Sequence, residues 1–348
     1  MSDPAPPALS PEMAAINKGP RVLIIGWIFT ATATLFVAAR LFSRLKKLGR
    51  VGAGDYLVIL SLTLGYIYMS LISVAVGSGA GRHVAALPVT QAERALLFTP
   101  IAFIPGILSY TVPKFAVVIL IRDLLSPSRK HLAAIWILAG CSAVLTVLCI
   151  VFVYAQCDPP RALWTIGLKA RCWDPVVLIA TSIAASASSA LFDFWFALYP
   201  AVVLWRMQIH SRKKLALSTA LGFGVCAGSI AAYKCTTFKE AGEHFGDFTC
   251  TAVDLVIWTS IEANSVIISA CIPMLLPLVE LIVGENFLNG GENSPNRGSR
   301  TRSLSTIRTH PKQLYGNHSD GDTVEKEAGT QMKADWLRQV QGSHVQST

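Results

Sequence analysis

Apolar residues run in seven long blocks along the chain, and each block ends in a short cluster of charged or turn residues. A helix that crosses a bilayer needs roughly 20 mainly apolar residues, because the hydrocarbon core is about 30 Å thick and a helix rises about 1.5 Å per residue. Each block reaches that length. The pattern therefore predicts seven transmembrane helices, at about residues 22–42, 56–76, 95–121, 132–154, 176–205, 215–233 and 255–278.

The composition agrees with an all-α, polytopic membrane protein. Of 348 residues, 52% are hydrophobic and 15% are charged, whereas an ordinary soluble protein carries about 25% charged residues. The mean hydropathy is positive, at +0.49. These values argue against a soluble globule, a disulfide-rich miniprotein, a coiled coil and a disordered chain.

Two polar segments flank the predicted helices. Residues 1–20 contain several prolines and no apolar stretch of the kind found in a cleavable signal peptide. Residues 285–348 are rich in Gly, Ser, Asn, Thr and mixed charges, so they cannot bury enough apolar surface to offset their chain entropy. We expect a short N-terminal tail, a seven-helix domain over residues 21–284, and a disordered C-terminal tail.

The distribution of Lys and Arg predicts the orientation. The connections after the first, third and fifth helices hold twelve of these residues, packed against helix ends, and the opposite side holds nine. Cytoplasmic loops carry the excess of positive charge, so we expect the N-terminus outside and the C-terminus in the cytoplasm. The net charge of +9 lies in loops and tail. It suits a lipid bilayer and a cytoplasmic signalling partner, and it gives no case for nucleic acid.

Four of the eight cysteines flank the outer loops. Cys157 and Cys172 enclose the loop between the fourth and fifth helices, and Cys235 and Cys250 enclose the loop between the sixth and seventh. One disulfide within each loop is our first choice, but four cysteines allow three connectivities, so pairing across the loops stays open. No matching His pair accompanies them, and we therefore expect no metal site. The others lie inside spans, where a thiol behaves as a small hydrophobe: Cys141, Cys149, Cys226 and Cys271.

Ionisable residues within the spans are the candidates for function. An ionised side chain at the bilayer centre costs several kcal/mol unless it is paired or hydrated, and Lys114, Asp193 and Glu262 lie well inside. The depths of Lys114 and Asp193 overlap, which predicts an ion pair between the third and fifth helices. Glu262 shares a face with Asp254 and Trp258 at four-residue spacing. These five residues could form a ligand site or only polar contacts between helices.

Known catalytic and cofactor motifs are absent from the sequence. A retinal protein needs a lysine in its last helix, and the seventh span has none. Walker-type loops, HExxH and GxSxG are missing as well. We therefore expect no cofactor, and the sequence shows no recognised hydrolase or ATPase chemistry. The only candidates for acid–base catalysis are the carboxyl groups of Asp193 and Glu262.

Several segments together resemble a known family. The fifth-helix stretch from Ser189 to Trp205, the seventh-helix stretch from Asp254 to Pro277 and the glycine-rich loop from Gly77 to His83 are similar to those of fungal rhodopsin-domain integral membrane proteins. The pair Arg40 and Arg44 and the loop from Cys157 through Trp164 to Cys172 fit as well. The likeness covers about residues 15–285. One departure is Ala53-Gly54-Asp55, where such proteins carry a Trp and two acidic residues.

The resemblance implies a fungal protein of seven-helix, receptor-like topology that does not use retinal. Some members are discussed as surface sensors and others occur in secondary-metabolite gene clusters. Our first hypothesis is therefore a receptor-like sensor, in the plasma membrane rather than the endoplasmic reticulum. It would respond to a small lipophilic ligand.

The alternative is a protein of a biosynthetic gene cluster. It could be an accessory protein, or an intramembrane cyclase or isomerase in which protonated Asp193 or Glu262 is the general acid on a lipophilic substrate. A transporter is disfavoured, because the halves show no internal repeat.

Overall fold

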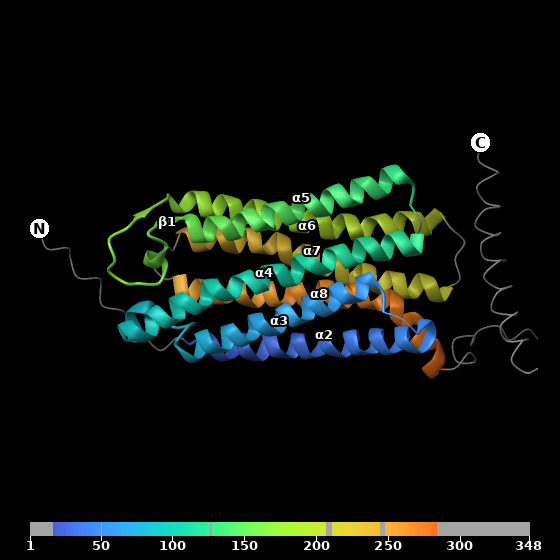
Figure 1. The fold of residues 1–348 in the computed structure, drawn as a ribbon, viewed down its shortest axis with the longest axis horizontal. Helices are drawn as coiled ribbons and strands as arrows, with labels where there is room; N and C mark the ends of the chain where they lie inside the picture. The colour runs from blue at the N-terminus through green and yellow to red at the C-terminus, as the bar shows by residue number, and fades with distance from the viewer. Residues whose placement is uncertain (1–16, 50, 126, 207–210, 244–247, 284–348) are drawn as a thin grey trace, which may run out of the picture. The chain divides into compact units, whose positions relative to one another are not determined.

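A computed structural model describes residues 17–49, 51–125, 127–206, 211–243 and 248–283. Most of the predicted N-terminal tail, and the predicted C-terminal tail at 285–348, lie outside these ranges. The described residues form seven long helices that run side by side as a bundle (Figure 1). In chain order they are α2 (Gly19–Leu48), α3 (Ala53–Gly77), α4 (Val89–Leu125), α5 (Arg129–Ala155), α6 (Pro175–Arg206), α7 (Ser211–Glu243) and α8 (Phe248–Val283).

Each predicted span falls within one of these helices, so the helical fold class is confirmed. Six helices of the described part are long and apolar enough to cross a membrane: α2, α3, α4, α5, α6 and α8. The sixth predicted span lies in α7, which is not among them. The helices are also longer than predicted, because polar residues extend them beyond the apolar blocks. In α7 this extension carries the helix from Tyr233 to Glu243.

Helix α8 lies at the centre of the packing. It contacts α2, α3, α4 and α7, and 78% of its most apolar stretch is buried, against 28% for the corresponding stretches of α2, α3 and α5. Small and branched side chains such as Val256, Ile267 and Cys271 fill its contacts with the neighbouring helices. Several polar side chains of α8, among them Glu262, Asn264 and Ser265, are therefore enclosed by other helices.

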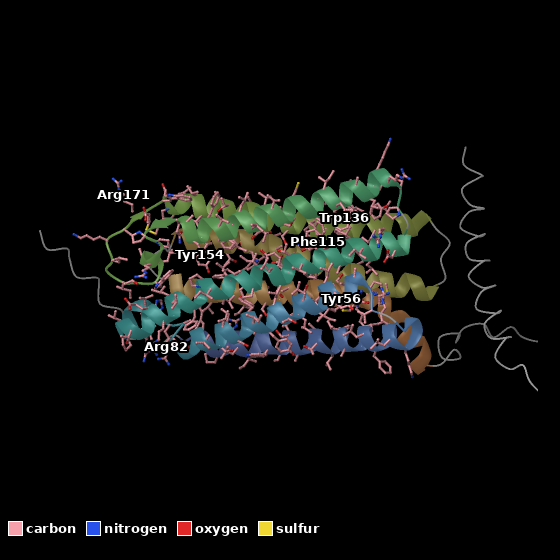
Figure 2. All side chains as sticks on the ribbon, in the orientation of Figure 1. Tyr56, Arg82, Phe115, Trp136, Tyr154 and Arg171 are labelled. Carbon is pink, nitrogen blue, oxygen red and sulfur yellow. A yellow bond between two sulfur atoms is a disulfide. The ribbon has the colours of Figure 1, made fainter. Side chains whose placement is uncertain are left out.

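The outer surface of the bundle is apolar. Ile24 and Leu35 on α2, and Ile137 and Val144 on α5, are more than half exposed, as expected for side chains that face lipid rather than water. The side chains in Figure 2 include Phe115 of α4 and Trp136 of α5, whose ring centroids lie 6.1 Å apart. Exposed apolar helix faces and buried polar groups together give the pattern expected of a membrane bundle.

The connection between α5 and α6 folds into a small hairpin. Strand β1 (Cys157–Asp158) pairs antiparallel with β2 (Arg171–Cys172), with a 3₁₀ turn, η2 (Pro160–Leu163), between them. Cys157 and Cys172 face each other in this register and form a disulfide. The first predicted bridge is therefore present.

The segment before α2 and the connection between α3 and α4 lie at the same end of the bundle as this hairpin. The amide of Lys18, just before α2, donates to the carbonyl oxygen of Gly81 at 3.0 Å, in the segment between α3 and the 3₁₀ turn η1 (Val84–Ala86). The amide of Ile166, in the hairpin loop, donates to Oε1 of Glu93 at the start of α4. Gly81 has φ +98°, and a Cβ there would lie 2.7 Å from the amide nitrogen of Gly19, so the contact requires glycine.

Candidate functional site

Lys114 of α4 and Asp193 of α6 form the ion pair that their depths predict. Lys114 Nζ lies 3.2 Å from Asp193 Oδ1, and both side chains are at least 95% buried. Lys114 also donates to the hydroxyl of Ser189 at 2.6 Å and to the Ser189 carbonyl oxygen at 3.3 Å. Ser189 and Asp193 are four residues apart and therefore share one face of α6, which is why one lysine reaches both.

A second buried ion pair lies next to the first. Lys234 Nζ of α7 lies 2.9 Å from Glu262 Oε2 of α8, and the side chains are 4% and 1% exposed. The Ser189 hydroxyl donates to the other carboxylate oxygen of Glu262 at 2.7 Å. Lys114, Asp193, Ser189, Lys234 and Glu262 thus make one continuous chain of polar contacts across α4, α6, α7 and α8, which we call the core network.

The core network balances its charges. Two lysines face two carboxylates, so their formal charges sum to zero. Removing one partner from a buried pair typically costs about 3–5 kcal/mol, because the remaining charge is left uncompensated. Arrangements of the four helices that break either ion pair are therefore unfavourable.

Aromatic rings lie close to the amines of both lysines. Lys234 Nζ lies 4.9 Å from the ring centroid of Tyr110, and Lys114 Nζ lies 5.8 Å from the same ring and 5.0 Å from that of Phe192. A cation over an aromatic face is stabilised by roughly 0.5–2 kcal/mol. Tyr110 thus contacts both cations of the core network. Its ring is a second connection between the two ion pairs, in addition to the Ser189 hydroxyl.

Lys234 is the charged member of the core network that the sequence did not suggest. The sixth apolar block ends at Tyr233, which placed Lys234 in an outer loop. In the structure α7 continues through it, and Lys234 continues the buried face formed by Ala227, Ile230 and Ala231. That helical spacing was the available signal.

Asp254 and Trp258 lie apart from the core network although they share a face of α8 with Glu262. Asp254 Oδ2 lies 2.8 Å from Lys18 Nζ, and both side chains are more than one third exposed. Trp258 packs against Tyr233 of α7, with ring centroids 4.9 Å apart. Four residues of helix advance the chain by about 6 Å. The spacing therefore aligns these residues along the helix without bringing their contacts together.

A further buried ion pair joins α2, α3 and α8. Arg40 donates to Asp55 Oδ1 at 2.7 Å and to the carbonyl oxygen of Ala270. Asp55 Oδ2 accepts from the Gly52 amide and so also caps α3; Arg44 Nε lies 3.5 Å away from it. Asp55 and Arg40 are 0% and 2% exposed. The acidic residue retained at this junction is thus a structural anchor.

The second predicted disulfide is not formed. Cys235 is a free cysteine, and its Sγ donates to the carbonyl oxygen of Ile183 on α6 at 3.8 Å. The expected bridge to Cys250 assumed that Cys235 lies in a loop after the sixth helix. Because α7 runs on to Glu243, Cys235 instead lies inside a helix, against α6. The side chain of Cys250 lies outside the described residues.

Metal binding has no support in the described ranges. Within them, no three His, Cys, Asp or Glu side chains gather closely enough to hold a metal ion. The core network itself offers amines, carboxylates and a hydroxyl, which can exchange hydrogen bonds and protons.

The sequence model of the fungal rhodopsin domain family matches residues 39–281 of the chain. The chain belongs to the fungal rhodopsin domain family. The matched segment includes the core network, the Arg40–Asp55 pair and the disulfide hairpin. The fungal rhodopsin domain thus extends over nearly all of the helical bundle.

Two curated relatives come from fungal biosynthesis clusters. Fugralins biosynthesis cluster protein 2 of Gibberella zeae is 25% identical over 184 residues, which are 49% of this chain and 45% of the relative. This chain therefore aligns with less than half of that protein. The polyenoic acids biosynthesis gene cluster protein Ba17b of Metarhizium anisopliae is 25% identical over 325 residues, or 84% of this chain and 85% of the relative. No solved structure matches the chain.

Proposed function

We propose that this protein is a receptor-like membrane sensor whose core network changes its pairing when a small lipophilic ligand binds. The observation that carries the proposal is the joining of four helices by two buried ion pairs through one serine hydroxyl. Such a network has a small number of favourable arrangements, because any intermediate arrangement leaves a charge unpaired in a medium of low dielectric constant. Discrete arrangements are what a signalling bundle requires.

The proposed topology is seven spans with the N-terminus outside. The α5–α6 hairpin carries a disulfide, and disulfides form and persist on the oxidising side of a membrane. Lys18, just before α2, contacts Gly81 in the connection between α3 and α4, and Ile166 of the hairpin contacts Glu93 at the start of α4. The start of α2 therefore lies at the same end of the bundle as the disulfide. With that end outside, the Lys- and Arg-rich connections face the cytoplasm. The plasma membrane is the proposed location, and α7 is the sixth span.

In the proposed domain arrangement, residues 21–284 form the membrane domain and residues 285–348 a cytoplasmic tail. The basic loops and the tail would then bind a signalling partner. The ion pair of Arg40 with Asp55, and the Arg40 contact to Ala270, support a path for this signal. They join α8, which carries Glu262, to the cytoplasmic ends of α2 and α3.

Proximity labelling from the C-terminal tail tests the sensor proposal. The wild type is compared with a Lys114→Met/Asp193→Leu double variant, which removes one buried pair without leaving a lone charge. The matched control is Lys18→Met/Asp254→Leu, which removes an ion pair that is more than one third exposed and lies outside both the core network and the basic loops. We expect the first variant to change the set of labelled proteins and the control to leave it unchanged. Identical sets in all three would contradict the proposal.

A role within a biosynthetic cluster is the second candidate, favoured by the names of the two relatives. In its enzymatic form Asp193 or Glu262 would act on a lipophilic substrate. Both carboxylates contact lysines, however, and the cavity beside Asp193 measures only about 20 Å³. The geometry therefore favours the sensor.

Metabolite and transcript profiles separate the two candidates. The gene is deleted in the source organism, or replaced by a Glu262→Gln allele. If the protein is an enzyme, one precursor accumulates while the transcripts of neighbouring genes stay constant. If it is a sensor, the affected metabolites fall together with the transcripts. An accessory protein would give a third pattern. In the Glu262→Gln strain the amount of product would fall, while no precursor accumulates and the transcripts of neighbouring genes stay constant.

A further inference from the structure

One oxygen of the core network lacks a partner among the described protein groups. Asp193 Oδ2 is buried and makes no hydrogen bond with any of them, while Oδ1 faces Lys114. All three N–H groups of Lys114 are engaged by Ser189 Oγ, the Ser189 carbonyl oxygen and Asp193 Oδ1. An unpaired carboxylate oxygen in a helical bundle is costly, so a further donor is needed.

Asp193 is one of the residues that line a small cavity. Its volume is about 20 Å³, and its walls come from α4, α6, α7 and α8. The polar groups in its lining belong to Asp193, Lys114 and Ser269, and the apolar lining includes Phe192 and Phe196. A cavity needs roughly 10–15 Å³ of such space and at least two polar partners to hold a water molecule. The cavity is large enough, and Asp193, Lys114 and Ser269 supply polar side chains among its lining residues.

We propose that this cavity binds one water molecule, which donates a hydrogen bond to Asp193 Oδ2. Its second hydrogen bond goes to the Ser269 hydroxyl on α8, which has two lone pairs and one proton and can therefore serve more than one partner. The water then links α6 to α8 on the side of Asp193 that faces away from Lys114. This inference concerns hydration of the core and holds whether or not the protein is a sensor.

Gly224 of α7 offers a direct way to fill the cavity. It contributes to the lining, and a Cβ added there would lie 3.4 Å from Ala197 Cβ and 3.8 Å from the Asp193 carbonyl oxygen. Those are contact distances without a clash, so Gly224→Ala should fold and displace the water. Gly222, on the same helix, is the matched control, because a Cβ there would have nothing within 4 Å.

Thermal unfolding of the purified full-length protein in nanodiscs shows whether filling the cavity raises or lowers the unfolding midpoint. Both alanines raise helix propensity, so the comparison isolates the cavity. If water serves Asp193, we expect the midpoint of Gly224→Ala to lie below that of Gly222→Ala. A midpoint equal to or above that of Gly222→Ala would overturn the proposal, because filling a dry cavity with a methyl group does not remove a hydrogen bond.

Radiolytic footprinting in H₂¹⁸O tests the water itself, since hydroxyl radicals form from water bound next to a side chain. We expect Phe192 and Phe196 to be labelled faster than Tyr68, which is as buried as Phe192 but lies in another cluster. Gly224→Ala should abolish this difference, whereas Gly222→Ala should keep it. Equal labelling of the three rings in the wild type would overturn the proposal.

Discussion

The Ser189 hydroxyl donates a 2.7 Å hydrogen bond to the Glu262 carboxylate, which joins α6 to α8 in the interior of the bundle. The same oxygen accepts a 2.6 Å hydrogen bond from Lys114. One hydroxyl therefore connects the two ion pairs, and its proton points in a fixed direction, away from Lys114 and toward Glu262. A change at either pair alters the hydrogen bonds available to the other.

Replacing Ser189 with alanine should destabilise the protein by about 1–3 kcal/mol, because Lys114 loses an acceptor and Glu262 loses a donor in a buried site. Thermal unfolding in detergent measures the loss. Ser188→Ala is the control, since the Ser188 hydroxyl donates only to the Ala185 carbonyl oxygen within its own helix. Equal midpoints for the two variants would show that Ser189 does not connect the pairs.

Lys234→Met should cost about 3–5 kcal/mol, because Glu262 keeps its charge without its cation. Adding Glu262→Gln should restore part of the lost stability, and a double-mutant cycle on the free energy of unfolding measures the coupling. The comparison pair is Lys18 and Asp254, which is more than one third exposed and should couple by no more than about 1 kcal/mol. Additive losses at Lys234 and Glu262 would contradict the buried pairing.

Arg40→Met should lower stability far more than Arg44→Met. Arg40 is almost fully buried and holds Asp55 at 2.7 Å, whereas the Arg44 side chain is 17% exposed and lies 3.5 Å from the same carboxylate. Removing Arg40 also frees the Ala270 carbonyl oxygen. Expression yield and unfolding midpoint in detergent measure the difference, and similar losses for both variants would count against Asp55 as an anchor of α2 and α8.

The disulfide hairpin provides a test of orientation. Intact cells are treated with a permeant maleimide to block free thiols, then with an impermeant reductant and an impermeant fluorescent maleimide. We expect labelling that disappears in a Cys157→Ser/Cys172→Ser variant, because the proposed topology places that end of the bundle in the medium. Labelling that appears only after permeabilisation would contradict an outward-facing N-terminus at the plasma membrane.

The sequence predicted the helices and the first ion pair for a clear physical reason. Membrane spans require long apolar blocks, so the few ionised residues inside them stand out, and a fixed rise per residue gives their depth. Lys114 and Asp193 could therefore be matched although 79 positions separate them in the printed sequence. Glu262 was likewise evident as a buried charge, but its partner was not.

The environments of Lys234, Cys235 and Ser189 could not be predicted in this way. They depend on where the helices end and on which helix faces meet. Apolar length alone ended the sixth helix at Tyr233, so Lys234 and Cys235 were both assigned to a loop, and one missed helix end produced two errors. The role of Ser189 was beyond the sequence as well. Serine is common in membrane helices, where most hydroxyls donate back to their own backbone, as Ser188 does here. Only the contacts of Ser189 with Lys114 and Glu262, which come from other helices, distinguish the two serines.

The separation of paired residues along the chain sets an order for their assembly during synthesis. Arg40 and Asp55 are 15 residues apart, so at roughly 5–20 residues per second both have been made within about 1–3 s of each other. Lys114 precedes Ser189 by 75 residues and waits roughly 4–15 s for its partners. During that interval a cationic helix exists without its counter-charge. The nascent chain must therefore hold α4 at the translocon, at a chaperone or near water until α6 arrives.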